Sequence, residues 1–183
     1  MKARRLVTLF GCSVLAVSLS GCVLNAEYGE AREGAEGLIA SRHHELSTRF
    51  VQTVVNAAPA VTNRKDLEEA GVTEHILLTD DEQALVAAGL RVGNTIYALD
   101  ESQEHPAIDV YIYGIGSSNR GFVTATTDLF ACGRLTYAAG VRDVTTVDLD
   151  CPDWLTGWRG PDAEEVSLTA TMSKYPATTD QEP

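Results

Sequence analysis

Basic residues are scarce in this sequence. Lysine and arginine together number 14, against 26 aspartate and glutamate residues, and the formal net charge is −12. Residues 1–21 hold three of the basic residues and no acidic one, so the rest of the chain has a formal charge of −15. Such a charge keeps a protein soluble, and it repels nucleic acid and anionic lipid headgroups. The composition therefore argues against nucleic-acid binding and against a basic membrane-binding face.

Motifs of the common hydrolases are also missing. The sequence contains neither a Gly-x-Ser-x-Gly nucleophile elbow nor a Ser-x-x-Lys motif. Gly114, Gly116 and Gly121 follow a predicted strand, but a nucleotide-binding loop would need a helix after them, and a strand follows. We therefore expect these glycines to form a hairpin turn, and we do not expect an enzyme. A glycosidase with a pair of catalytic carboxylates is left as a possibility, because the sequence has many acidic residues.

The histidine and aspartate patterns give no metal site. The histidines are His43, His44, His75 and His105. His43 and His44 are adjacent, whereas two zinc ligands on a helix stand at positions i and i+4. We expect His43 to be a hydrogen-bonded residue at the edge of the core. Asp148, Asp150 and Asp153 could offer oxygen ligands to calcium, but the calcium-loop pattern is absent, so we expect a solvated rim and no cofactor.

A long hydrophobic run is missing as well. The apolar stretch over residues 6–19 has 14 residues, whereas a helix that crosses a membrane needs about 20. It follows the basic start Lys2, Arg4 and Arg5, and it precedes the small residues Ser20 and Gly21. This arrangement is typical of a secretory signal peptide. The sequence therefore predicts export, with residues 1–21 as the signal peptide.

The stretch Leu19-Ser20-Gly21-Cys22 resembles the lipobox of bacterial lipoproteins, in which a branched apolar residue and two small residues precede a cysteine. The resemblance covers residues 1–22 and implies cleavage after Gly21 and a thioether between Cys22 and diacylglycerol. Two acyl chains hold a protein stably at a membrane. We therefore expect a lipid anchor on the extracytoplasmic face of the cell membrane. A secreted protein cut elsewhere and a retained signal anchor are the alternatives.

Cysteine is used sparingly, with four in the whole chain. Cys12 leaves with the signal peptide and Cys22 takes the lipid, so Cys132 and Cys151 remain as a pair. Disulfides persist in exported proteins, and the 18 residues between the two cysteines give a loop of ordinary size. We expect a structural disulfide. A redox pair and metal ligation are the alternatives, but the sequence has no Cys-x-x-Cys spacing.

Hydrophobic periodicity divides the mature chain into a tether, one domain and a tail. Residues 22–37 contain glycines and glutamates, and we expect them to form a lipidated tether that enters a helix early or late. Over residues 38–57, apolar residues recur at steps of three and four, which predicts a long amphipathic helix that Pro59 ends. We expect one domain over residues 38–172 and a flexible tail over residues 173–183.

Two shorter helices and a series of strands are expected after the long helix. Asn63 should cap a helix over Arg64–Ala70 that ends at Gly71, and Thr79 should open a helix that ends at Ala88. The expected strands are Val72–Leu78, Thr95–Leu99, Ala107–Ile115, Phe122–Tyr137, Val141–Leu149 and Val166–Met172, with a turn over Ser117–Gly121. This order favours an α+β fold in which the long helix packs on an antiparallel sheet.

Trp154 and Trp158 are the two tryptophans of the chain, and their spacing could place them on one side of a helical turn. Exposed, the two rings would offer a stacking platform for a sugar or a peptide. Buried, they would cover the disulfide and the edge of the sheet. Burial is the commoner outcome for so large a side chain, so the platform is kept as the alternative.

Two segments of the body, Ala131–Tyr137 and Val147–Pro152, resemble small lipoproteins of high-GC Gram-positive bacteria, many of which have no assigned activity. This resemblance brings no catalytic residues. We therefore expect a non-catalytic binding module of the envelope whose partner is an envelope protein or a cell-wall ligand. An envelope hydrolase with convergent carboxylates, and a carrier with an apolar cavity for a small ligand or lipid, are the alternatives.

Overall fold

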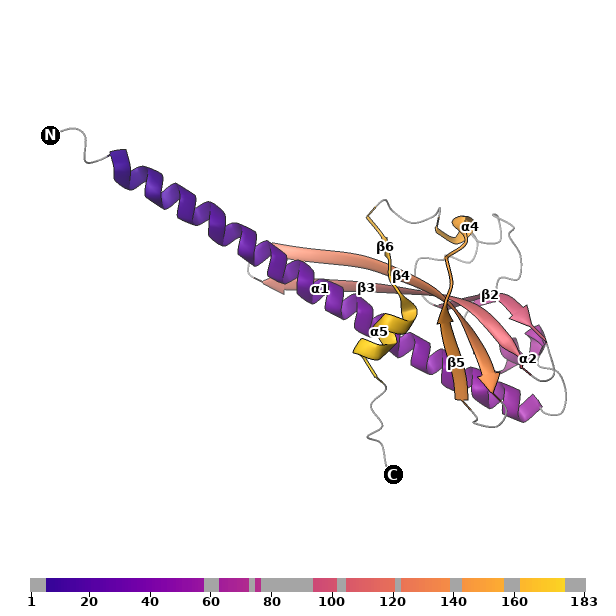
Figure 1. The fold of residues 1–183 in the computed structure, drawn as a ribbon. Coiled ribbons are helices and arrows are strands. Elements are labelled where there is room, and N and C mark those ends of the chain that lie inside the picture. Colours follow the sequence, from indigo (N-terminus) through magenta and orange to yellow (C-terminus); the bar gives the residue numbers. More distant parts are fainter. Residues whose placement is uncertain are drawn as a thin grey trace, which may run out of the picture.

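A computed structural model describes residues 6–57, 63–72, 75–76, 94–101, 105–120, 123–138, 143–156 and 162–176, with side chains from Asn25 onward. The expected α+β fold is confirmed. A long N-terminal helix lies on one face of a sheet whose main strands are antiparallel (Figure 1). The helix expected over residues 79–88 lies outside the described residues.

Helix α1 runs without interruption from Leu6 to Ala57, so the helix expected over residues 38–57 is confirmed and begins far earlier. The buried stripe that faces the sheet consists of Glu27, Ala31, Ala35, Ile39, Leu46, Phe50 and Val54. The expected tether over residues 22–37 is thus helical, and from Glu27 onward it belongs to the folded body. The buried positions of residues 25–37 are alanines and glutamates. The hydrophobic periodicity that would predict a packed helix is therefore absent from this stretch of the sequence.

The sheet is built around one long hairpin. Its strands are β1 (His75–Ile76), β2 (Asn94–Asp100), β3 (Ala107–Arg120), β4 (Val123–Ala138), β5 (Asp143–Asp148) and β6 (Glu164–Glu165). They lie in the order β1-β2-β3-β4-β5, and β6 pairs in parallel with β4. β1 runs parallel to β2, and the neighbours from β2 to β5 are antiparallel. β3 and β4 form a hairpin that is paired from Ala107 with Thr136 to Arg120 with Val123.

Helix α2 (Arg64–Glu69) begins where its capping residue predicts. The Asn63 side chain accepts a hydrogen bond from the Asp66 backbone N–H, and the Asp66 carboxylate accepts one from the N–H of Asn63. This reciprocal pair satisfies two of the donors that a helix start leaves open. Gly71 follows with φ at 60°, a conformation that favours glycine after a helix.

The last element is a helix, so the strand expected over Val166–Met172 is wrong. Helix α5 spans Leu168–Lys174, and the Ser167 side chain caps it by accepting from the Ala170 N–H. Leu168 and Thr171 are buried, which is a helical spacing. The alternating apolar residues in the sequence fit a strand equally well, and the N-cap decides between the two. Because Ser173 and Lys174 belong to α5, the expected tail can begin only after this helix.

Two glycines of β3 allow α1 to lie directly on the sheet. A Cβ atom on Gly116 would collide with the carbonyl oxygen of Ala31, and one on Gly114 with that of Ala35. The expectation that these glycines form a turn is therefore wrong, because strand pairing continues beyond both of them to Arg120. The turn expected over Ser117–Gly121 is wrong for the same reason at Ser117–Arg120, which belong to β3. Gly121 lies outside the described residues. Glycine is needed here because two backbones approach each other closely.

The opposite face of the sheet carries a second buried layer. Tyr111 and Phe130 stack there, with ring centroids 5.9 Å apart. The expected disulfide between Cys132 and Cys151 is confirmed, and its Cα atoms lie 5.2 Å apart. It fastens the segment that contains α4 (Asp153–Thr156) to this face. Closing a loop of this size stabilises the folded state by about 3 kcal/mol.

Alanine substitutions at two glycines should change stability in opposite directions. Gly116→Ala forces α1 away from β3, and we expect it to lower the free energy of unfolding by roughly 3 kcal/mol. Gly37→Ala adds a methyl group that meets nothing within 4 Å. It should raise the free energy of unfolding by roughly 0.5–1 kcal/mol through helix propensity. Urea unfolding measures both, and a stable Gly116→Ala variant would contradict the close contact.

Candidate functional site

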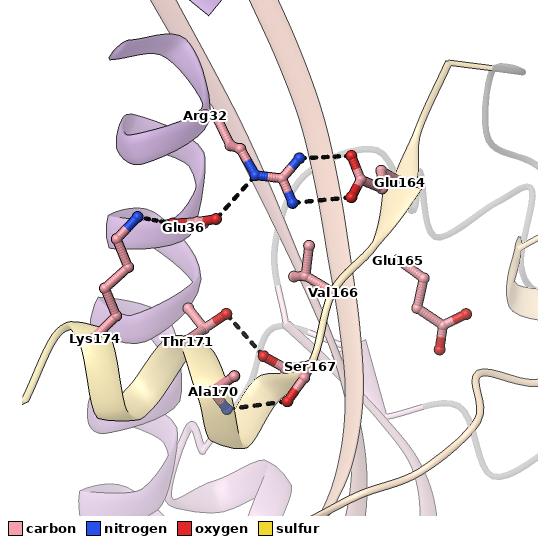
Figure 2. Close-up of a pocket in the computed structure, with 9 residues that line it drawn as sticks. All are labelled: Arg32, Glu36, Glu164, Glu165, Val166, Ser167, Ala170, Thr171 and Lys174. Carbon is pink, nitrogen blue, oxygen red and sulfur yellow. Dashed lines mark hydrogen bonds and ion pairs between the residues drawn. The ribbon is translucent and has the colours of Figure 1, made fainter. Parts of the chain in front are cut away.

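An open cleft of about 330 Å³ lies between α1 and the C-terminal segment that contains β6 and α5 (Figure 2). Its lining residues are Arg32, Glu36, Glu164, Glu165, Val166, Ser167, Ala170, Thr171 and Lys174. The segment is held in place because β6 pairs with β4 and because the fully buried Leu168 packs over Gly133. The cleft is the candidate site because charged side chains from three elements meet in it.

Four charged side chains form a chain of ion pairs along the cleft. Arg32 forks onto Glu164, with Nη1 donating to Oε2 at 2.6 Å and Nη2 donating to Oε1 at 2.9 Å. Its Nε donates to Oε1 of Glu36 at 3.1 Å, and Nζ of Lys174 donates to Oε2 of Glu36 at 2.6 Å. Opposite charges therefore alternate from β6 through α1 to α5 and hold the C-terminal segment on α1.

These ion pairs keep both carboxyl groups ionised. Partial burial alone would raise the pKa of Glu36, but hydrogen bonds and positive charge from Lys174 and Arg32 outweigh burial and lower the pKa. The hydrogen bond from Arg32, aided by its charge, also lowers the pKa of Glu164. A general acid needs a pKa near the operating pH. The lowered pKa values suit binding through fixed charges better than proton transfer.

Sequence patterns do not predict this group of charges as a site. Arg32 and Glu36 stand at positions i and i+4 of a helix, a spacing typical of an ion pair, and this signal could have suggested the first contact. Glu164 is 132 positions from Arg32, and Lys174 is 138 positions from Glu36. Contacts over such separations depend on the whole fold, and no local motif indicates them.

The three aspartates weighed as calcium ligands have separate surroundings. Asp148 accepts a hydrogen bond from the Ser167 hydroxyl at 2.8 Å and one from the Thr169 backbone N–H at 2.9 Å. It thereby fixes the start of α5, which borders the cleft. Asp150 and Asp153 are exposed. Within the described part of the chain, no three potential ligands are grouped so that they could hold a metal ion.

Trp154 covers the disulfide side of the sheet. It lies half-buried in α4, and its ring meets that of Tyr97 edge-on, with centroids 6.3 Å apart. The same cluster contains Cys151, so the placement matches the expected cover over the disulfide. Trp158 lies outside the described residues. Burial, with the nearby charge of Asp109, raises the pKa of Tyr97 to about 12, so its hydroxyl stays protonated near neutral pH.

His43 is the hydrogen-bonded residue at the edge of the core that the sequence predicts. It is buried on α1, and its Nε2 lies 2.9 Å from Oγ1 of Thr146 on β5. Burial, reinforced by the charge of His44, lowers the pKa of His43 to about 4. Ser47 lies beside it, with Oγ 3.4 Å from Nε2, and is buried too. Both side chains of this serine–histidine pair thus lie beneath the surface, between α1 and β5.

The lipobox-like stretch lies within α1. The backbone at Gly21 and Cys22 is helical, and Cys22 precedes the buried Glu27 by five positions. None of the helices described here is long and apolar enough to span a membrane. Comparisons with protein families, curated proteins and solved structures found no match to this chain.

Replacing His43 should flatten the pH dependence of stability. Unfolded histidine takes up a proton near pH 6.5, whereas folded His43 does so near pH 4. The unfolded chain thus binds more protons between these values, and the wild type should lose up to roughly 3 kcal/mol as the pH falls through them. In urea unfolding, His43→Gln should lack this loss. His44→Gln, at an exposed neighbouring position, removes only the smaller cause of the lowered pKa of His43 and should keep most of this loss. Equal pH dependence of stability in the two variants would refute the assignment.

Glu36→Gln should loosen α5. The substitution removes the carboxylate that joins Arg32 to Lys174, so amide exchange in α5 should accelerate on the order of tenfold at neutral pH. Because the pKa of Glu36 is lowered, its contribution is present above pH 4.5 and is lost as the pH falls through the lowered value. Hydrogen exchange of α5 checks both effects. Glu33→Gln, exposed one turn earlier, is the control, and exchange as fast as in Glu36→Gln would speak against the ion-pair chain.

Proposed function

We propose that this protein is a bacterial lipoprotein, anchored through lipid on Cys22, whose domain binds an envelope protein or a cell-wall ligand without catalysing a reaction. The stretch Leu19-Ser20-Gly21-Cys22, directly after a short apolar run, carries the proposal. Cleavage after Gly21 would place Cys22 at the start of the mature chain, where two acyl chains suffice for stable attachment. The domain would then lie on the extracytoplasmic face of the cell membrane.

The contact between α1 and β3 favours a binding module over a lipid carrier. A carrier would need an apolar cavity of several hundred Å³ between helix and sheet. At Gly114 and Gly116 the helix backbone touches the strand, so this part of the interface leaves no space for a ligand. Further along α1 the interface is filled by fully buried side chains such as Ile39, Leu46 and Phe50.

The cleft favours binding over hydrolysis. The carboxylates of Glu36 and Glu164 are paired with cations, and the side chains of Arg32, Glu164 and Lys174 are 40%, 55% and 51% exposed. These groups can reach the charges of a partner. The planar fork of Arg32 binds a carboxylate through two hydrogen bonds, and a carboxylate of the partner would take the place of Glu164 on it. A peptide or cell-wall fragment that carries both carboxylate and amino groups has matching chemistry.

Metabolic labelling with an alkyne analogue of palmitate tests the anchor. We expect the wild type to carry the label and to sediment with membranes, and Cys22→Ala to lose the label and to accumulate as uncleaved precursor. Cys12→Ala is the matched control, because Cys12 lies in the same helix but on the side that cleavage removes. A wild-type protein without label, or a Cys22→Ala protein labelled as strongly as the wild type, would contradict the proposal.

A further inference from the structure

We infer that the domain stands end-on at the membrane, with the end of the β3–β4 hairpin against the phospholipid headgroups. The hairpin end comprises Ser117–Asn119 of β3 and Thr124–Thr126 of β4. The inference rests on the proposed lipid anchor at Cys22. It adds which surface of the domain meets the lipid and which part extends away from it.

The anchor lies close to the hairpin end. Cys22 is five positions before Glu27, which corresponds to a rise of about 7.5 Å along an α-helix. Glu27 is fully buried, and Oγ of Ser118 lies within hydrogen-bonding distance of the carboxylates of Glu27 and, at 2.8 Å, of Glu30. α1 therefore contacts the hairpin end little more than one helical turn after Cys22.

The rest of the domain extends away from the anchor along α1 (Figure 1). α1 meets β5 where His43 contacts Thr146. His43 is 16 positions beyond Glu27, a further rise of about 24 Å. In an end-on domain β5 is thus far from the lipid, whereas in a domain lying flat β5 would be as close to the lipid as the hairpin end. The two orientations differ by a distance that can be measured.

Charge favours the end-on orientation. From Gly116 to Thr127 the sequence has no acidic residue and one basic residue, Arg120. The solvent side of α1 carries the exposed Glu33, and Asp150 is exposed in the segment that covers the opposite face of the sheet. Anionic headgroups repel these carboxylates. A helix that lies flat on a membrane instead needs an apolar face beside a basic one.

The side chains at the hairpin end suit contact with headgroups. Ser117, Asn119, Thr124 and Thr126 are exposed, polar and uncharged. Hydroxyl and amide groups donate hydrogen bonds, which phosphate and ester oxygens accept. None of these four exposed side chains is a carboxylate that the headgroups would repel; the carboxylates of Glu27 and Glu30 lie beside them on α1, where both approach the Ser118 hydroxyl.

The test places one fluorophore at either end of the domain in the full-length, lipidated protein. Thr126→Cys and Thr145→Cys supply the thiols. Both threonines are exposed, and they share a face of the sheet because Thr145 pairs with Thr136 and strand side chains alternate. The proteins are reconstituted into vesicles of equal parts phosphatidylcholine and phosphatidylglycerol, with or without a nitroxide on the headgroup.

We expect the nitroxide lipid to reduce the fluorescence at position 126 several times more than the fluorescence at position 145. Equal quenching at the two positions, or stronger quenching at 145, would overturn the end-on orientation. The mass of the intact protein reports the lipid on Cys22 in each sample. Equal quenching in lipidated protein would contradict the end-on orientation but not the lipid anchor on Cys22. Protein without lipid on Cys22 would contradict both the anchor and the orientation.

Discussion

The direct contact between the backbones of α1 and β3 is the constraint on which the rest of the structure depends. Alanines on the helix face glycines on the strand, and a single methyl group on Gly116 would have no space. Because the helix lies so close, its polar residues reach the ends and sides of the sheet. Glu27 meets Ser118 at one end, and His43 meets Thr146 at the other. The same proximity places Arg32 and Glu36 beside the C-terminal segment.

The C-terminal segment is held by polar contacts in addition to the apolar packing of Val166, Leu168 and Met172 on the core. Leu168 supplies a buried apolar contact, while Asp148 fixes the start of α5 and the Arg32–Glu36–Lys174 chain fixes its far side. The disulfide acts on the opposite face of the sheet. Charges are therefore concentrated where the last element joins the body, and this joint is also the edge of the cleft.

Sequence patterns predict the elements whose signals are local. The apolar period of the long helix, the Asn63 cap, the antiparallel strands and the cysteine pair are each marked by a few neighbouring residues or by composition. Helix α5 is missed because its apolar residues fit two periods equally well. The role of Gly114 and Gly116 is missed because it depends on the close approach of α1, which no neighbouring residue indicates. The cleft is missed for the same reason, since its ion pairs join residues more than a hundred positions apart.

The order of elements along the chain has a consequence for how this molecule is made. The helix is synthesised first, yet Glu27 is 91 positions from Ser118, and His43 is 103 positions from Thr146. The face of α1 that packs on the sheet therefore stays exposed to solvent until β3 and β4 have been synthesised. During this time chaperones or other chains can bind it. A topology dominated by such distant pairings folds slowly. The packing of α1 therefore cannot be completed before the strands of the second half of the chain have been made and paired.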